Sequence, residues 1–105
     1  MNSLTDWETQ IKRFQLLSTE MLDLAHAGEW AAVAEWEEKR RVLLDDLYKT
    51  SPPAEVGPLL KDAAQFTLVS DARVQELAHA EMDKLSDRLR TIRQGRRALN
   101  AYQSS

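Results

Sequence analysis

Between Leu59 and Gln94 the chain contains neither proline nor glycine. Residues that recur in this stretch at separations of three or four, most of them apolar, fall along one face of a single long α-helix. These residues are Leu60, Ala64, Thr67, Asp71, Val74, Ala78, Met82, Leu85, Leu89 and Ile92. A helix of about 36 residues is roughly 54 Å long, and this length determines how much the rest of the chain has to cover.

The residues before Gly28 predict a first helix. Ser3 has the side chain of a helix N-cap, and Asp6 lies in the first turn, where an acidic residue is favoured. Apolar residues follow at helical spacing, and they are Leu4, Trp7, Ile11, Phe14, Leu17, Met21 and Leu24. Gly28 is expected to end this helix, because glycine readily adopts the left-handed backbone geometry found beyond helix C-termini.

A second helix is expected to begin at Glu29 or Trp30. Its apolar residues are Trp30, Val33, Ala34, Leu43, Leu44, Leu47 and Tyr48. In its middle, Glu37 and either Arg40 or Arg41 stand where apolar residues are expected. The short linker at Gly28 predicts that the first two helices form an antiparallel hairpin.

Residues 50–58 form the one clear loop, since they hold three prolines and a glycine. The helices are therefore expected at about 3–27, 29–49 and 55–94, with Ser70 and Asp71 as the point where the third helix can bend. Gly95 is expected to end that helix and to be followed by a separate helical segment at 96–103. The predicted fold is all-α, a single domain over residues 1–105, in which an antiparallel helical hairpin packs on a long third helix with a short C-terminal helical segment.

The predicted lengths leave part of the third helix uncovered. The first two helices are about 36 Å and 30 Å long, so roughly a third of the apolar face of the third helix is expected to contact water. An exposed apolar surface of this kind usually marks a protein-binding site. We therefore expect another subunit, a segment of a partner protein, or the chain's own C-terminal tail to cover it.

Composition excludes several classes of function. The chain has no cysteine, which excludes disulfides and thiolate metal sites. Its first residues resemble no signal peptide, and no apolar run approaches the roughly 18 residues of a membrane span. His26 and His79 are far apart, and no phosphate-binding or nucleophile motif is present. The sequence predicts a cytoplasmic protein that is not an enzyme and has no catalytic residue, cofactor, metal or membrane contact.

Most of the basic residues in the second half of the chain are close together. They are Lys84, Arg88, Arg90, Arg93, Arg96 and Arg97. The pattern fits a solvated helix surface with Asp83 and Asp87 interleaved, a surface for an acidic protein, or a nucleic-acid contact. Nucleic acid is the weakest of these interpretations, because the helix-turn-helix frame and the aromatic residues for base stacking are absent from this stretch.

A trough between the second and third helices is the predicted partner site. A helix docks in such a trough through side chains spaced i, i+3, i+4 and i+7. The residues expected to line it are Trp30, Val33, Leu44, Leu47, Val74, Leu77 and Leu85. Each of them also fits a place in the ordinary core of a helical bundle. A tail held in the trough through Leu99 and Tyr102 would compete with the partner.

The second helix resembles that of a known family. Residues 28–33 (Gly-Glu-Trp-Ala-Ala-Val), followed by Glu37, Arg40, Leu43, Leu44 and Leu47, resemble a helix of the FliT family of flagellar export chaperones. Residues 74–77 and 82–85, with the Ala101-Tyr102 end, resemble the long helix and the terminus of that family. Residues 66–71 depart from the family pattern.

The resemblance implies a function and partners. Such proteins bind the C-terminal segment of the filament cap protein, prevent its premature assembly and deliver it to the flagellar type III export apparatus, where they contact the ATPase complex. Some also bind the flagellar master transcription regulator. Their C-terminal helix folds over the binding surface, which implies a regulatory role for the segment from Arg96 and for Leu99 and Tyr102.

Two other classes of function remain open from the sequence. A helical structural module that self-associates through its long helix would cover the exposed face without a partner protein, and a weak homodimer is left open. A small regulator that binds nucleic acid would use the basic residues instead, and its binding would fall steeply with salt.

Overall fold

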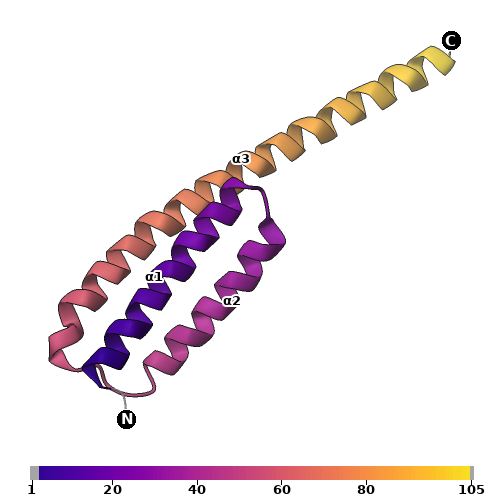
Figure 1. Cartoon of the computed structure of the whole chain (residues 1–105). Helices are drawn as coiled ribbons and strands as arrows, with labels where there is room; N and C mark the ends of the chain where they lie inside the picture. The colour runs from indigo at the N-terminus through magenta and orange to yellow at the C-terminus, as the bar shows by residue number, and fades with distance from the viewer. Residues whose placement is uncertain (1–2, 105) are drawn as a thin grey trace. The chain divides into compact units, whose positions relative to one another are not determined.

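The computed structural model describes residues 3–104, and these residues are almost entirely helical. Helix α1 spans Leu4–His26 and helix α2 spans Trp30–Leu47. A short 3₁₀ turn, η1, spans Ala54–Val56, and helix α3 follows at Gly57–Ser104. The predicted all-α class is confirmed, and α1 and α2 begin and end close to the expected positions. Figure 1 shows α1 and α2 running in opposite directions, as an antiparallel hairpin requires.

Both ends of α1 have the predicted caps. The Asp6 backbone N–H donates to Ser3 Oγ at 3.2 Å, and the Ser3 backbone N–H donates to Asp6 Oδ2 at 3.1 Å. This reciprocal pair satisfies two backbone donors that the helix leaves open. At the other end, Gly28 has φ +76°, and α2 begins two residues later. The positive φ is the conformation that glycine adopts without steric cost.

Helix α3 corrects the expected break at Gly95. It continues through this glycine to Ser104, so no separate segment forms at 96–103. Gly95 has no positive φ and therefore does not form a helix cap. The glycine costs about 1 kcal/mol of helix stability relative to alanine, and the arginines, alanine and leucine around it are good helix formers that outweigh this cost. Helix α3 also continues past Ser70 and Asp71.

The chain divides into two compact units. The N-terminal unit runs to Gln75 and contains α1, α2, η1 and the first part of α3, while the C-terminal unit begins at Glu76 and contains the rest of α3. The prediction of one domain over residues 1–105 stays a prediction, and Met1, Asn2 and Ser105 lie outside the described residues.

One part of the hydrophobic core of the N-terminal unit lies where its elements meet near η1. This part is a cluster of Trp7 and Ile11 of α1, Leu47 of α2, Val56 of η1 and Ala63 of α3. Further along the helices, Leu17, Met21 and Ala25 of α1 and Val33 of α2 are also buried. Trp7 and Val56 are both 1% exposed. Burying one large apolar side chain stabilises a fold by about 1.5–3 kcal/mol, so this cluster fixes the end of the bundle.

Five apolar residues of the C-terminal unit are exposed, while Leu77 near its start is half-buried. The five are Met82, Leu85, Leu89, Ile92 and Leu99, with exposed fractions of 49% to 64%. Within this unit, the apolar side chains of α3 are therefore accessible to a partner.

Candidate functional site

An apolar groove in the N-terminal unit is the candidate partner site. It is a cavity of about 370 Å³ that is open to solvent. Nine residues from three helices and Tyr48, the C-cap of α2, line it. The nine are Ile11, Phe14, Leu44, Leu47, Leu60, Ala63, Ala64, Thr67 and Leu68. We call it the α2–α3 groove, because its two sides come from these helices.

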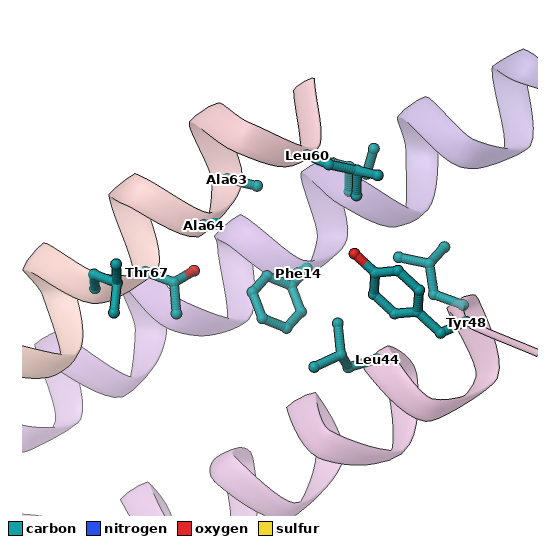
Figure 2. A pocket seen from close by; sticks show the side chains of 10 residues that line it. Phe14, Leu44, Tyr48, Leu60, Ala63, Ala64 and Thr67 are labelled. Atoms are coloured by element: carbon teal, nitrogen blue, oxygen red, sulfur yellow. The ribbon is translucent and has the colours of Figure 1, made fainter. Parts of the chain in front are cut away.

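Each helix contributes a different part of the α2–α3 groove. Figure 2 shows the Phe14 ring of α1 between Thr67 of α3 on one side and Leu44 of α2 with Tyr48, the C-cap of α2, on the other. The Tyr48 backbone N–H donates to the Leu44 carbonyl at 3.1 Å, so the last turn of α2 and its C-cap place both side chains on one side. On the α3 side, the short side chain of Ala64 leaves space that a longer residue would fill. Tyr48 is 53% exposed, which leaves its ring accessible to a partner.

A polar cluster holds the three helices together beside the α2–α3 groove. The guanidinium of Arg40 donates two hydrogen bonds to the carboxylate of Asp71, at 2.8 and 2.9 Å, and Arg40 Nη1 also donates to Ser18 Oγ at 3.0 Å. Arg40 lies over the Phe14 ring at 5.5 Å. Ser70 Oγ donates to the backbone carbonyl of Ser18 at 3.3 Å. Such two-bond pairing of arginine and carboxylate fixes orientation as well as distance.

The α2–α3 groove continues into a second hollow of more polar character. Phe14, Leu44 and Thr67 line both hollows, and the second one adds the charged residues Glu37, Glu38, Arg40, Arg41 and Asp71. A bound segment would therefore meet an apolar surface at one end and charged groups at the other.

Two of these charged residues perturb each other. A hydrogen bond from Arg41 lowers the pKa of Glu38, and the same bond together with the charge of Glu38 raises the pKa of Arg41. Arg41 also forms an ion pair with Asp45 at 3.3 Å. All three side chains are exposed, so the pairs organise surface charge and contribute little to stability.

One lining residue has an unsatisfied polar atom. Thr67 Oγ1 is buried and has no hydrogen-bond partner among the described residues. Buried polar atoms in native proteins are usually satisfied. A hydroxyl of this kind in an apolar groove is suited to a hydrogen bond with a bound chain or with water.

The structure brings together only some of the predicted partner-binding residues. Leu44 and Leu47 line the α2–α3 groove, but Leu47 is only 5% exposed and belongs to the core. Val33 is buried as well, at 6%. Leu47 and Val33 therefore lie in the core of the bundle, which was the alternative interpretation of these residues.

The remaining predicted partner residues lie outside the α2–α3 groove. Trp30 and Val74 are half-buried elsewhere in the N-terminal unit. Leu77 is half-buried and Leu85 exposed, and both belong to the C-terminal unit. Their contact with a partner stays a prediction.

The two predicted regulatory residues lie in the C-terminal unit. Leu99 is 55% exposed and Tyr102 is 81% exposed, both on the continuous helix α3. Their regulatory role also stays a prediction.

Eight of the ten groove residues are absent from the predicted partner site, and they are Ile11, Phe14, Tyr48, Leu60, Ala63, Ala64, Thr67 and Leu68. Phe14 and Tyr48 belong to the apolar faces predicted for the first two helices. The helical period alone, however, does not distinguish a core residue from one at the rim of a groove. Leu68 lies off the predicted face of α3 and is 71% exposed. No signal in the sequence identifies it.

Two further observations concern the described part of the chain. Residues 3–104 contain no group of three or more histidine, aspartate or glutamate side chains placed to hold a metal ion. None of the helices in this range combines the length and the apolar character needed to cross a membrane.

Comparison with known proteins gives one match. The model of the family described as flagellar protein FliT matches residues 8–104, which is nearly the whole chain. No curated protein and no solved structure matches it.

Proposed function

Because the chain belongs to the FliT family of flagellar proteins, we propose that it is a cytoplasmic export chaperone. It binds the C-terminal segment of the filament cap protein, prevents that protein from assembling early, and delivers it to the type III export apparatus through the ATPase complex. The family match supports the flagellar role, and the α2–α3 groove supports the chaperone role.

The observation that carries the proposal is the open apolar groove between two fixed helix faces. An amphipathic helix binds in this way by placing its apolar side chains in a groove and leaving its polar face in water. Leu44, Tyr48 and Leu68 are all at least 37% exposed, so the rim is accessible. The volume of about 370 Å³ lies at the lower end of the roughly 300–1,000 Å³ found for ligand pockets. It therefore suits a few anchoring side chains rather than a whole domain.

The groove also explains how binding prevents assembly. A client helix that holds its apolar face in the groove cannot present the same face to other copies of the client. The neighbouring charged hollow offers Arg40 and Arg41 as well as acidic groups. Polar contacts at this end would fix the direction of the bound helix, since charged groups contribute more to specificity than to affinity.

The test is calorimetric titration of the full chain with a peptide from the C-terminal segment of the filament cap protein. Ala64→Phe fills the groove from α3 and should weaken binding by about tenfold or more, equivalent to about 1.4 kcal/mol. Ala72→Phe is the matched control, because Ala72 is also exposed on α3 but does not line the groove. The control should bind like the unaltered chain.

A second pair of variants probes the α2 side. Leu44→Ala removes a lining side chain and should weaken binding, while Val42→Ala alters an exposed α2 residue that does not line the groove. Thermal unfolding of all four variants separates lost binding from lost folding. If the peptide fails to bind the unaltered chain, or if both members of each pair bind equally well, the groove is not the client site.

A further inference from the structure

The exposed apolar residues of the C-terminal unit have a spacing that repeats every seven residues. Met82, Leu85, Leu89, Ile92 and Leu99 are separated by three, four, three and seven residues, and Arg96 occupies the position that would continue the series between Ile92 and Leu99. We call these six residues the heptad stripe. Alternating steps of three and four form the seam of a two-helix coiled coil.

Basic side chains border the heptad stripe on both sides. With Met82, Leu89 and Arg96 at a and Leu85, Ile92 and Leu99 at d, Arg88 occupies g and Arg93 occupies e. Side chains at e and g lie next to the seam and select the partner through their charges. From Lys84 to Arg97 the chain has six basic residues and one acid, Asp87. Each border of the stripe therefore has one arginine, and the remaining e and g positions, Ser86 and Gly95, are uncharged.

A hollow beside Leu89 strengthens this pattern. Its lining includes Arg90, Arg93 and Arg97, and its volume is about 440 Å³. Arg90 already pairs with Asp87 at 4.0 Å. The guanidinium groups of Arg93 and Arg97 suit the hollow to a further carboxylate, since arginine is the preferred partner of planar anions. The hollow belongs entirely to the C-terminal unit.

A second copy of this chain fits the heptad stripe poorly. In a parallel pair, Arg88 of each copy would face Arg93 of the other, and the two Arg96 side chains would meet in the seam. In an antiparallel pair along the whole stripe, the two basic segments would lie against each other, because residues 84–97 are centred on the stripe. Like charges at these positions disfavour pairing.

A membrane surface also fits less well than a helix. Helices that lie on membranes have a broad apolar face, often with tryptophan or phenylalanine. The heptad stripe is the narrow seam of a coiled coil, and residues 82–99 contain no aromatic side chain.

We propose that residues 82–99 bind an acidic amphipathic helix of a partner protein. The apolar side chains of that helix cover the heptad stripe, and its carboxylates pair with Arg88, Arg93 and Arg96. This surface lies outside the α2–α3 groove and the N-terminal unit. The inference is therefore independent of the proposed client site, and each can fail without the other.

The experiment uses the full chain and two designed helical peptides, each about three heptads long with leucine at a and d. One peptide has glutamate at every e and g position, and the other has lysine there. The glutamate peptide should bind at least about tenfold more tightly than the lysine peptide at low salt, and its affinity should fall as salt is added. Equal binding of the two peptides, or no binding of the glutamate peptide, would overturn the proposal.

Charge exchange gives a sharper test. The double variant Arg88→Glu with Arg93→Glu should reverse the preference, so that the lysine peptide binds more tightly. Both side chains are exposed, so helicity by circular dichroism should be unchanged. The matched control is Lys61→Glu with Arg73→Glu, two exposed bases of α3 in the N-terminal unit, which should keep the preference for the glutamate peptide.

Two measurements distinguish the other occupants. Sedimentation over a range of concentrations should give the same result for the unaltered chain and for Leu89→Asp, because the heptad stripe does not form a dimer. Flotation with phosphatidylserine-containing vesicles should likewise give the same result for both, because the stripe does not bind the membrane. A dimer or a vesicle complex lost in Leu89→Asp, without binding of the glutamate peptide, would replace the proposed partner with that occupant.

Discussion

Arg40 of α2 and Asp71 of α3 form a two-bond ion pair, with Arg40 Nη1 2.8 Å from Asp71 Oδ1 and Nη2 2.9 Å from Oδ2. The Arg40 side chain is only 12% exposed, whereas the Asp71 side chain is 35% exposed. Arg40 also reaches Ser18 of α1, so one guanidinium connects all three helices of the N-terminal unit. Because the pair lies beside Leu44 and Thr67, it holds the two sides of the α2–α3 groove in position.

The first prediction concerns this pair. Asp71→Asn should lower the free energy of unfolding by about 1–3 kcal/mol, because it leaves the nearly buried charge of Arg40 without its carboxylate. Urea unfolding measures the change. Asp62→Asn, at an exposed position of the same helix, is the control and should change it by less than about 0.5 kcal/mol. An equal effect of both substitutions would contradict a specific role for the pair.

The ion pair shows what the helical period predicts and what it does not. The period placed Asp71 on the inner face of α3 and identified Glu37 and Arg40 or Arg41 as polar residues at inward positions of α2. It could not select Arg40 over Arg41, since both lie three or four residues from Glu37 and from Leu44. The structure resolves this choice, because Arg40 turns inward to Asp71 while Arg41 pairs with Glu38 and Asp45 on the surface. The feature of the sequence that indicated this ion pair was a polar residue at an inward position on each of two neighbouring helices.

The second prediction contrasts two glycines. Gly28→Ala should destabilise the chain by about 1 kcal/mol, because alanine is strained at φ +76°. Gly95→Ala should instead stabilise α3 locally by about 0.5–1 kcal/mol, because nothing lies within 4 Å of the added methyl group. Thermal unfolding tests the first substitution, and amide hydrogen exchange at residues 93–99 tests the second. Exchange that does not slow in Gly95→Ala would indicate that α3 is not continuous there.

These glycines also explain one success and one failure of sequence interpretation. Gly28 precedes a new helix start and follows a complete apolar series, so several signals agree on a helix end. At Gly95 the glycine is the only signal for an end, while Arg93, Gln94, Arg96 and Ala98 all favour a helix. The prediction of a break depended on Gly95 alone, and the helix-forming residues around it offset its cost to helix stability.

The third prediction concerns pH. Since the hydrogen bond from Arg41 lowers the pKa of Glu38, this carboxylate stays ionised to lower pH in the folded chain than in the unfolded chain. Its contribution to stability is complete above the unfolded pKa and is lost as the pH falls through the lowered folded pKa. In an NMR titration, Arg41→Gln should raise the Glu38 midpoint. Lys39→Gln is the control, because Lys39 lies over Trp36 and not against Glu38.

The fourth prediction separates stability from binding at Thr67. Valine has nearly the shape of threonine and lacks the hydroxyl that is unsatisfied in the free chain. Thr67→Val should therefore stabilise the free chain by up to about 1 kcal/mol. If the client accepts or donates a hydrogen bond at this hydroxyl, the same substitution weakens client binding by about fivefold.

Thr19→Val is the matched control for this prediction. Thr19 is exposed on α1, and its hydroxyl already donates to the Gln15 carbonyl at 3.1 Å. Its substitution should produce neither stabilisation nor a change in affinity. Higher stability with lower affinity in Thr67→Val alone would show that the α2–α3 groove keeps an uncompensated polar atom for its partner. Unchanged affinity would show that the client makes no hydrogen bond to the Thr67 hydroxyl.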